Sequence, residues 1–176
     1  MRHHLKYLAG FILLCLLSAC NSIPENAKPV RSFNKVRYLG VWYEIARMDF
    51  KYERDLSNVT ASYSLRSDGK IRVDNKGYNE KKQEWERSIG KAKFAGDESI
   101  AKLKVSFFGP FYSGYNVVAI DKDYEYALVV GNNLDYMWIL SRKPNIPAGI
   151  KTFYLSIARN IGYDISRLTW TAHDRD

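Results

Sequence analysis

A succession of short β-prone runs, separated by turn residues and never by a helical pattern, constrains this chain of 176 residues most strongly. Asp68-Gly69 is typical of a hairpin turn between two such runs. The predicted strands cover residues 40–50, 58–65, 70–78, 85–96, 100–107, 115–121, 124–131 and 135–142. Neighbouring strands without crossover helices pair antiparallel, and eight of them can close into a barrel without free edges. We predict an all-β, eight-stranded antiparallel up-and-down barrel.

One amphipathic helix is predicted after the last of these strands. Its apolar stripe recurs at helical spacing in Ile150, Phe153, Tyr154, Ile157, Ala158 and Ile161. Asn145 and Pro147 suit the start of the helix, and Gly162 suits its end. The outer wall of the barrel is the surface on which this stripe can be buried. Residues 167–170 could add a short final strand.

The run GVWYEIARMDF, residues 40–50, is interpreted as a strand because helical spacing would scatter its apolar residues around the cylinder. Alternation with period two separates it into two faces, one with Trp42, Glu44, Ala46 and Met48 and one with Tyr43, Ile45, Arg47 and Asp49. Both faces hold large apolar residues, as expected of a wall between two packed layers. The first face would look into the barrel and the second toward the helix.

Residues 1–19 have the layout of a secretion signal, with Arg2 and Lys6 before an apolar stretch too short for an ordinary membrane span. The sequence LSAC, which ends at Cys20, resembles the lipobox of bacterial lipoproteins, in which the cysteine is acylated and becomes the N-terminus. An ordinary signal cut nearby is the alternative. Asn21, by resemblance to that class, favours the outer membrane over the inner one. We expect a lipid-anchored protein on the periplasmic face of the outer membrane.

The mature chain is expected to form one domain after a short connection. Residues 20–33, with two prolines and few large apolar side chains, are interpreted as the acylated N-terminus and a linker. Residues 34–176 would form the barrel and its helix. The net charge of +8 loses two positive charges with the signal, and the remaining basic residues are scattered without a nucleic-acid motif. We expect no nucleic-acid partner; anionic lipid or simple solubility explains the charge.

Cysteine and histidine are nearly absent from the mature chain. Cys20 and His173 would be the only residues of these types outside the signal. An internal disulfide is excluded, and a zinc site or a Cys–His or Ser–His catalytic pair in the barrel is nearly excluded. We predict neither a metal nor a cofactor.

Three motifs resemble those of the lipocalin family. YLGVWYEIAR places Gly40 and Trp42 in the positions of the Gly-x-Trp signature. IDKDYEYALV is similar to the second motif around Thr-Asp-Tyr, with Asp121 retained and Ile120 replacing the threonine. WILSR, which ends in Arg142, resembles the third motif. Together with the lipobox, this order of motifs resembles the bacterial outer-membrane lipocalins, a group akin to apolipoprotein D.

The resemblance implies structural roles for the motif residues. Trp42 would close the bottom of the barrel with Arg142 lying across its indole, a cation–π pair of about 0.5–2 kcal/mol. Asp121 would act at the end of a strand. Many lipocalins also tie the C-terminal tail to the barrel by a disulfide, and this chain has no cysteine pair to do so.

Alternation along the strands predicts which side chains face the interior. If Trp42 and Arg142 point inward, every second residue of their strands does the same. The predicted ligand-binding residues are Glu44, Met48, Phe94, Val105, Phe107, Tyr115, Tyr136 and Trp138. The alternative for each is packed core. For Glu44, a salt bridge that involves Arg142 is weighed against a polar contact to a ligand head group.

The dimensions of the barrel suggest its ligand. A nine-residue strand is about 30 Å long and, tilted by about 40°, stands roughly 23 Å tall, enough for one long acyl chain. We expect a long-chain fatty acid or a lysophospholipid, bound for lipid storage or transport or for envelope maintenance under stress, as the resemblance implies. Two alternatives are a lipid-modifying enzyme that uses Glu44 with Asp121 or a tyrosine, and an envelope scaffold whose barrel is filled by its own side chains.

The loop of residues 107–115, FFGPFYSGY, carries five aromatic residues. Exposed aromatic side chains on a loop indicate a partner surface or contact with lipid. Phe111 and Tyr112 folded back over the barrel would be the alternative. A homodimer through this loop or a neighbouring face is possible.

Overall fold

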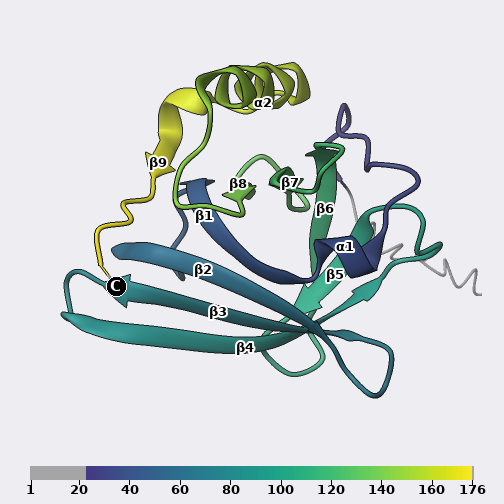
Figure 1. Cartoon of the computed structure of the whole chain (residues 1–176), viewed down its shortest axis with the longest axis horizontal. Coiled ribbons are helices and arrows are strands. Elements are labelled where there is room, and N and C mark those ends of the chain that lie inside the picture. The colour runs from purple at the N-terminus through teal and green to yellow at the C-terminus, as the bar shows by residue number, and fades with distance from the viewer. Residues whose placement is uncertain (1–22, 176) are drawn as a thin grey trace, which may run out of the picture.

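The computed structural model describes residues 23–175; Cys20 and the predicted signal peptide lie outside this range. Within it, eight antiparallel strands form a closed barrel (Figure 1). They are β1 (Gly40–Met48), β2 (Leu56–Leu65), β3 (Ile71–Asn79), β4 (Glu84–Phe94), β5 (Lys102–Ser106), β6 (Ser113–Ile120), β7 (Tyr126–Val130) and β8 (Met137–Ser141). β1 pairs with β2 on one side and with β8 on the other, which closes the ring. The predicted barrel is confirmed.

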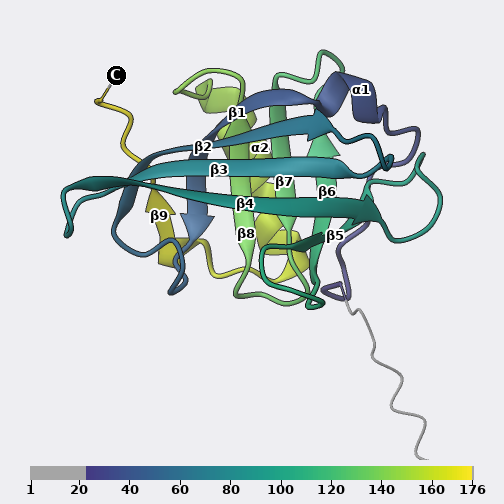
Figure 2. The same ribbon diagram turned by 90° about the horizontal axis from the view of Figure 1, so that it is seen from below.

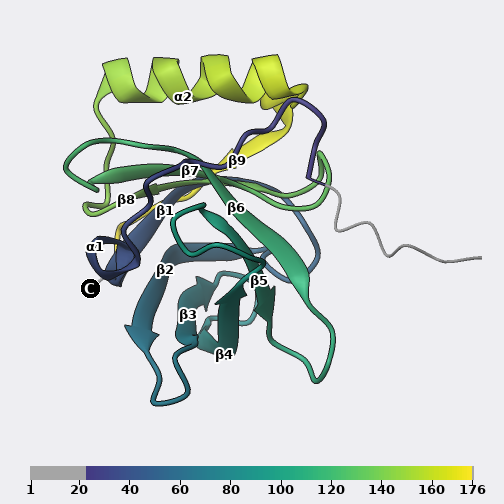
Figure 3. The same ribbon diagram turned by 90° about the vertical axis from the view of Figure 1, so that its right-hand side faces the viewer.

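The helix α2 (Ala148–Ile161) lies across the outside of the barrel (Figure 3). Tyr154, Ala158 and Ile161 of the predicted stripe are buried, and the Tyr154 hydroxyl donates a hydrogen bond of 2.9 Å to the carbonyl of Tyr126 in β7. The helix ends at Gly162, which has a φ of +114° that favours glycine. The predicted helix, its position and its end are confirmed.

The strands form a wall between two apolar layers. Trp42 and Leu140 belong to the layer inside the barrel, together with residues of β2 to β6. Ile45, Leu128 and Ile139 belong to the layer between the barrel and α2. β1 contributes to both layers, as its two mixed faces predicted.

Residues 23–33 do not form a free linker, so that part of the prediction is wrong. Ala27 and Phe33 are buried. The Val30 N–H donates to the carbonyl of Val117 at 2.9 Å, and the Val30 carbonyl accepts from the N–H of Ala101 at 2.9 Å. The segment adheres to the barrel because Ala27 packs in the layer that contains α2 and Phe33 packs at the closed end. The short helix α1 (Lys35–Tyr38) follows it.

The C-terminal tail is held by hydrogen bonds. After the 3₁₀ turn η1 (Ile165–Arg167), the strand β9 (Leu168–Trp170) pairs with the end of β1, which confirms the predicted final strand. The Asn58 N–H then donates to the carbonyl of Ala172 at 2.7 Å. The Asn58 Oδ1 accepts from the N–H groups of Asp174 and Arg175, both at 2.9 Å. These contacts link the tail to β2 without a disulfide.

Candidate functional site

A cavity of about 480 Å³ occupies the interior of the barrel and opens at one end. This volume lies within the range of about 300–1,000 Å³ that is typical of small-molecule sites. The apolar part of its wall includes Val59, Ala61, Val73 and Leu140. Six predicted ligand-binding residues also line it, namely Glu44, Val105, Phe107, Tyr115, Tyr136 and Trp138. The barrel is therefore not filled by its own side chains.

Met48 does not line the cavity, and its predicted inward orientation is wrong. The register of β1 against β8 shifts between Glu44 and Ala46, as it does at a β-bulge. One extra residue reverses the inward and outward alternation that follows. Ala46 and Met48 consequently pack in the layer that contains α2, whereas the side chain of Arg47 turns toward the polar contacts of Glu44.

Phe94 lies at the closed end, outside the cavity. Its ring centroid is 6.2 Å from that of Phe33, and it packs against the inner apolar layer. Its inward orientation agrees with the prediction, but Phe33 from the N-terminal segment fills the space beside it. Phe94 is part of the packed floor.

Trp42 and Arg142 form the predicted stacked pair at this floor. The guanidinium carbon of Arg142 lies 3.9 Å from the ring centroid of the fully buried Trp42. The indole Nε1 donates to the carbonyl of Tyr38 at 2.8 Å. Arg142 also donates to the carbonyls of Val41 and Leu39, at 2.8 and 2.9 Å. The pair closes the barrel and ties α1 to it.

The other two motif residues support the backbone at the same end. Gly40 has a φ of +97°, and a Cβ there would lie 3.3 Å from Nη1 of Arg142. The Asp121 Oδ1 accepts from the N–H groups of Glu125 and Tyr126, both at 2.7 Å. Asp121 holds the turn between β6 and β7 and does not line the cavity.

Three tyrosines meet at the inner end of the cavity. The Tyr115 hydroxyl lies 2.6 Å from that of Tyr38 and 2.8 Å from that of Tyr63. Tyr63 and Tyr115 both line the cavity. Burial raises the pKa of all three phenols, so they stay neutral and can donate and accept hydrogen bonds. The apolar cavity thus ends in a small polar group of hydroxyls.

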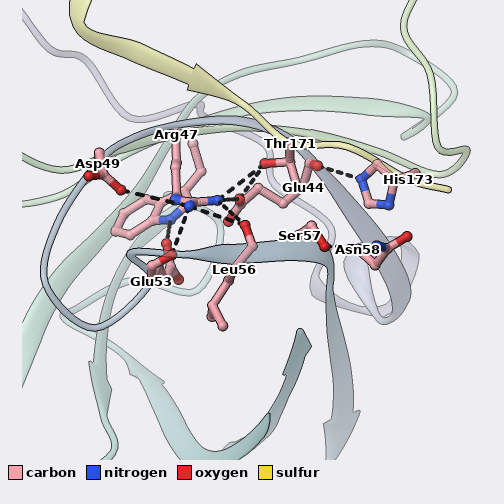
Figure 4. A network of polar contacts seen from close by, with 10 residues as sticks. Glu44, Arg47, Asp49, Glu53, Leu56, Ser57, Asn58, Thr171 and His173 are labelled. Carbon is pink, nitrogen blue, oxygen red and sulfur yellow. Dashed lines mark hydrogen bonds and ion pairs between the residues drawn. The ribbon is translucent and has the colours of Figure 1, made fainter. Parts of the chain in front are cut away.

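Glu44 is held by an ion pair with Arg47 (Figure 4). The two residues are 3% and 1% exposed, and Nη1 of Arg47 donates to Oε1 of Glu44 at 2.7 Å. The Thr171 hydroxyl donates to the same oxygen at 2.6 Å. The salt-bridge interpretation of Glu44 is therefore confirmed, but its partner is Arg47. Arg142 lies instead on Trp42 at the closed end.

Glu53, which was not predicted as a site residue, brings a second carboxyl group to the wall of the cavity beside Glu44. It lies in the loop between β1 and β2, and Nε1 of Trp138 donates to its Oε2 at 2.9 Å. Nη2 of Arg47 donates to its carbonyl at 2.7 Å. Burial, followed by the negative charge of Glu44, raises the pKa of Glu53 to about 8. At neutral pH the wall carries one ion pair and one neutral carboxyl group.

The raised pKa of Glu53 predicts a decrease in stability as the pH rises. In the unfolded chain the carboxyl group loses its proton near pH 4.5, whereas the folded chain retains it to about pH 8. Because the folded state binds more protons in this window, the free energy of unfolding falls as the pH rises through it. Glu53→Gln should remove a loss on the order of 3 kcal/mol between about pH 5 and pH 8. Denaturant unfolding at several pH values measures the slope.

Glu84→Gln is the matched control for this prediction, because Glu84 is an exposed carboxylate at the start of β4. It should keep the pH slope of the unmodified protein. Equal slopes for Glu53→Gln and the unmodified protein would contradict the assignment of the proton to Glu53.

Aromatic side chains surround the open end of the cavity. The ring centroid of Phe50 lies 5.3 Å from that of Tyr136 and 5.9 Å from that of Trp138. Phe108 and Phe111 of the β5–β6 loop also line the cavity, yet they are 66% and 78% exposed. Phe111 is therefore not folded back over the barrel.

Two structural features are not found in the described part of the chain. Residues 23–175 contain no group of three or more His, Cys, Asp or Glu side chains that could hold a metal ion. No helix in the same range is long and apolar enough to cross a bilayer.

Comparisons with known proteins agree with the barrel and its motifs. Residues 33–173 match the lipocalin-like domain family. The outer membrane lipoprotein Blc of Citrobacter freundii is 51% identical over 168 residues, covering 94% of this chain and 95% of the relative. Blc of Escherichia coli K12 is 52% identical, covering 88% and 89%. Insecticyanin from the tobacco hornworm Manduca sexta, 20% identical, has the same fold with a TM-score of 0.70 over 88% of each chain. The chain belongs to the lipocalin family.

Proposed function

We propose that this protein is an outer-membrane lipoprotein, anchored through acylated Cys20 and facing the periplasm, that binds one fatty acid or lysophospholipid in its barrel. Its role would be lipid storage or transport, or envelope maintenance under stress. The observation that carries the proposal is the cavity of about 480 Å³ with an apolar wall and one open end. The similarity to the Blc lipoproteins supports the anchor and the location.

The acyl chain would lie against the apolar wall and leave its head group near the open end. Val59, Ala61 and Val73 of β2 and β3 supply a surface for methylene groups, each of which contributes about 0.8 kcal/mol when buried. Binding in the micromolar range or tighter follows after the cost of ordering the chain.

The charges of the wall favour a head group that carries a cation. Glu44 and Glu53 line the cavity, and Arg47, the cation beside them, is already paired with Glu44. A fatty-acid carboxylate placed there would gain no free cation. An ammonium group beside Glu53 would instead favour loss of the proton from this neutral carboxyl group and pair with the carboxylate that forms. Asn75 also lines the cavity, and its Oδ1 accepts no hydrogen bond from the described residues. These acceptors favour a lysophospholipid with an amine head group over a free fatty acid.

The two alternative functions have less support. An enzyme was predicted to use Glu44 with Asp121 or a tyrosine. Asp121 is engaged in a turn outside the cavity, and Glu44, although it lines the cavity as Tyr63 and Tyr115 do, is bound by Arg47 and Thr171. A scaffold with a filled barrel does not fit the open cavity. Reversible burial of the acyl chain needs no chemical step.

Filling the cavity should abolish lipid binding. Ala61 lines the cavity on β2, and Ala61→Trp would place an indole in the space of the acyl chain. We expect lipid affinity to fall at least tenfold, about 1.4 kcal/mol or more. Solvent extraction of the purified protein followed by mass spectrometry, together with titration of a fluorescent lysophospholipid, measures the effect.

Ser62→Trp is the control, because the adjacent residue on β2 points to the outer face and adds the same indole there. It should leave extracted lipid and affinity unchanged. Intact affinity in a folded Ala61→Trp variant, or absence of any lipid from the unmodified protein, would contradict the proposal.

A further inference from the structure

Three exposed aromatic side chains, Tyr52, Phe108 and Phe111, form a surface at the cavity entrance that we call the rim patch. They are 64%, 66% and 78% exposed, and all three also line the cavity. The rings of Tyr52 and Phe108 lie 6.1 Å apart, so the two loops that carry them meet. Large aromatic side chains gathered in this way on a monomer mark an interaction surface. The patch is continuous with the site that would hold the acyl chain.

Lysines accompany these aromatic residues. The Nζ of Lys51 lies 4.6 Å from the ring centroid of Tyr52. Beside the second loop, the Nζ of Lys93 lies 4.7 Å from the ring centroid of Tyr112. Aromatic rings with lysines beside them suit the boundary between lipid tails and head groups, where the ring enters and the ammonium stays with the phosphates.

The described chain also begins at the open end of the barrel. From Val30, which bonds to Val117 of β6, the segment leads back to Ile23 against the layer of α2. Figures 2 and 3 both place its first residues at the end that carries the β5–β6 and β7–β8 loops. Cys20 is three residues away in the sequence, which limits it to about 11 Å from Ile23. An anchor at Cys20 and the rim patch therefore belong to the same end.

We infer that the rim patch docks on the phospholipid leaflet that holds the anchor, so that the cavity opens directly onto the bilayer. This inference rests on the proposed acylation of Cys20. A lipid could then leave the leaflet tail first and enter the barrel without crossing water. The closed end, with α1 and the Trp42–Arg142 pair, would face away from the membrane.

Site-directed spin labelling can test the orientation in the acylated mature protein, which starts at Cys20, reconstituted into vesicles of phosphatidylethanolamine and phosphatidylglycerol. Apart from Cys20, the mature chain has no cysteine, so Phe111→Cys provides a single free thiol. Val36→Cys is the matched control, because Val36 is an apolar residue that is 64% exposed on α1 at the closed end. Collision of the label with oxygen, which concentrates in bilayers, is compared with collision with a water-soluble nickel chelate.

The label at Phe111 should favour oxygen over the nickel chelate at least fivefold more than the label at Val36. Flotation of the protein with vesicles reports the anchor separately. Flotation with equal accessibility at both positions would overturn the docking inference alone, whereas loss of flotation would overturn the anchor and the docking together. Spin–spin broadening at Phe111 that disappears on dilution with unlabelled protein would assign the patch to a second copy and overturn contact with the leaflet. Phe108→Cys repeats the measurement if Phe111→Cys fails to fold.

Discussion

Replacing Arg47 with methionine is expected to lower the free energy of unfolding by about 3–5 kcal/mol, because the substitution leaves a buried carboxylate without its partner. Nη1 of Arg47 is 2.7 Å from Glu44, and Nη2 donates to the carbonyls of Glu53 and Leu56 at 2.7 and 3.2 Å. Methionine fills a similar volume but donates no hydrogen bond. The loop that leads from β1 to β2 would lose its attachment to the wall of the cavity.

Denaturant unfolding of four proteins isolates the ion pair. Arg47→Met and Glu44→Gln are measured singly and together, and the double variant should lose less than the sum of the single losses. Arg72→Met is the control, since Arg72 forms a partly exposed pair with Asp74 at 3.4 Å and should cost less than about 1 kcal/mol. A loss for Arg47→Met as small as that for Arg72→Met would refute the proposed role of the ion pair.

The orientation of Arg47 could not be predicted from the sequence. Period-two alternation placed Trp42 and Glu44 correctly in the interior, because β1 is regular up to that point. The sequence Glu44-Ile45-Ala46 contains no glycine or similar residue that would indicate the bulge that follows. It depends on how β8 and β9 pair with β1, which are contacts distant in sequence. Alternation therefore assigned Met48 to the cavity and missed Arg47.

The directions of side chains in the loops could not be predicted for a different reason. Glu53 and Tyr52 lie between strands, where no periodicity states which way a side chain points. Glu53 reaches the wall only because the Arg47 guanidinium and the Trp138 indole bind it there. By contrast, Gly162 and Asp68-Gly69 were predictable, because local backbone geometry alone determines their positions.

The N-terminal segment was misjudged because its composition is that of a linker. Two prolines and few large side chains suggested residues 20–33 as a connection, but Ala27 and Phe33 are buried against the barrel. Burial of two or three apolar side chains is enough to hold a short segment when its backbone also bonds to a strand. Neither the strand nor its free hydrogen-bonding groups can be identified before the barrel is built.

Replacing Trp42 with alanine is expected to cost about 3–5 kcal/mol of the free energy of unfolding while leaving the proposed lipid site in place. Trp42 is fully buried under Arg142, and its Nε1 bonds to the carbonyl of Tyr38. Alanine would leave a void at the floor and remove both contacts. Trp42 does not line the cavity, so the folded fraction should bind lysophospholipid with the affinity of the unmodified protein.

Two further variants separate the contributions of the indole. Trp42→Phe keeps an aromatic ring under Arg142 but loses the bond to Tyr38, so its cost should fall between zero and that of Trp42→Ala. Trp85→Ala removes an exposed indole on β4 and should cost about 1 kcal/mol or less. Chemical unfolding ranks the three variants by their free energy of unfolding, and titration of the folded proteins gives their affinities for lysophospholipid. If Trp42→Ala costs no more than Trp85→Ala, the floor is not held by this pair. If instead affinity falls in folded Trp42→Ala, the floor shapes the lipid site as well as closing the barrel.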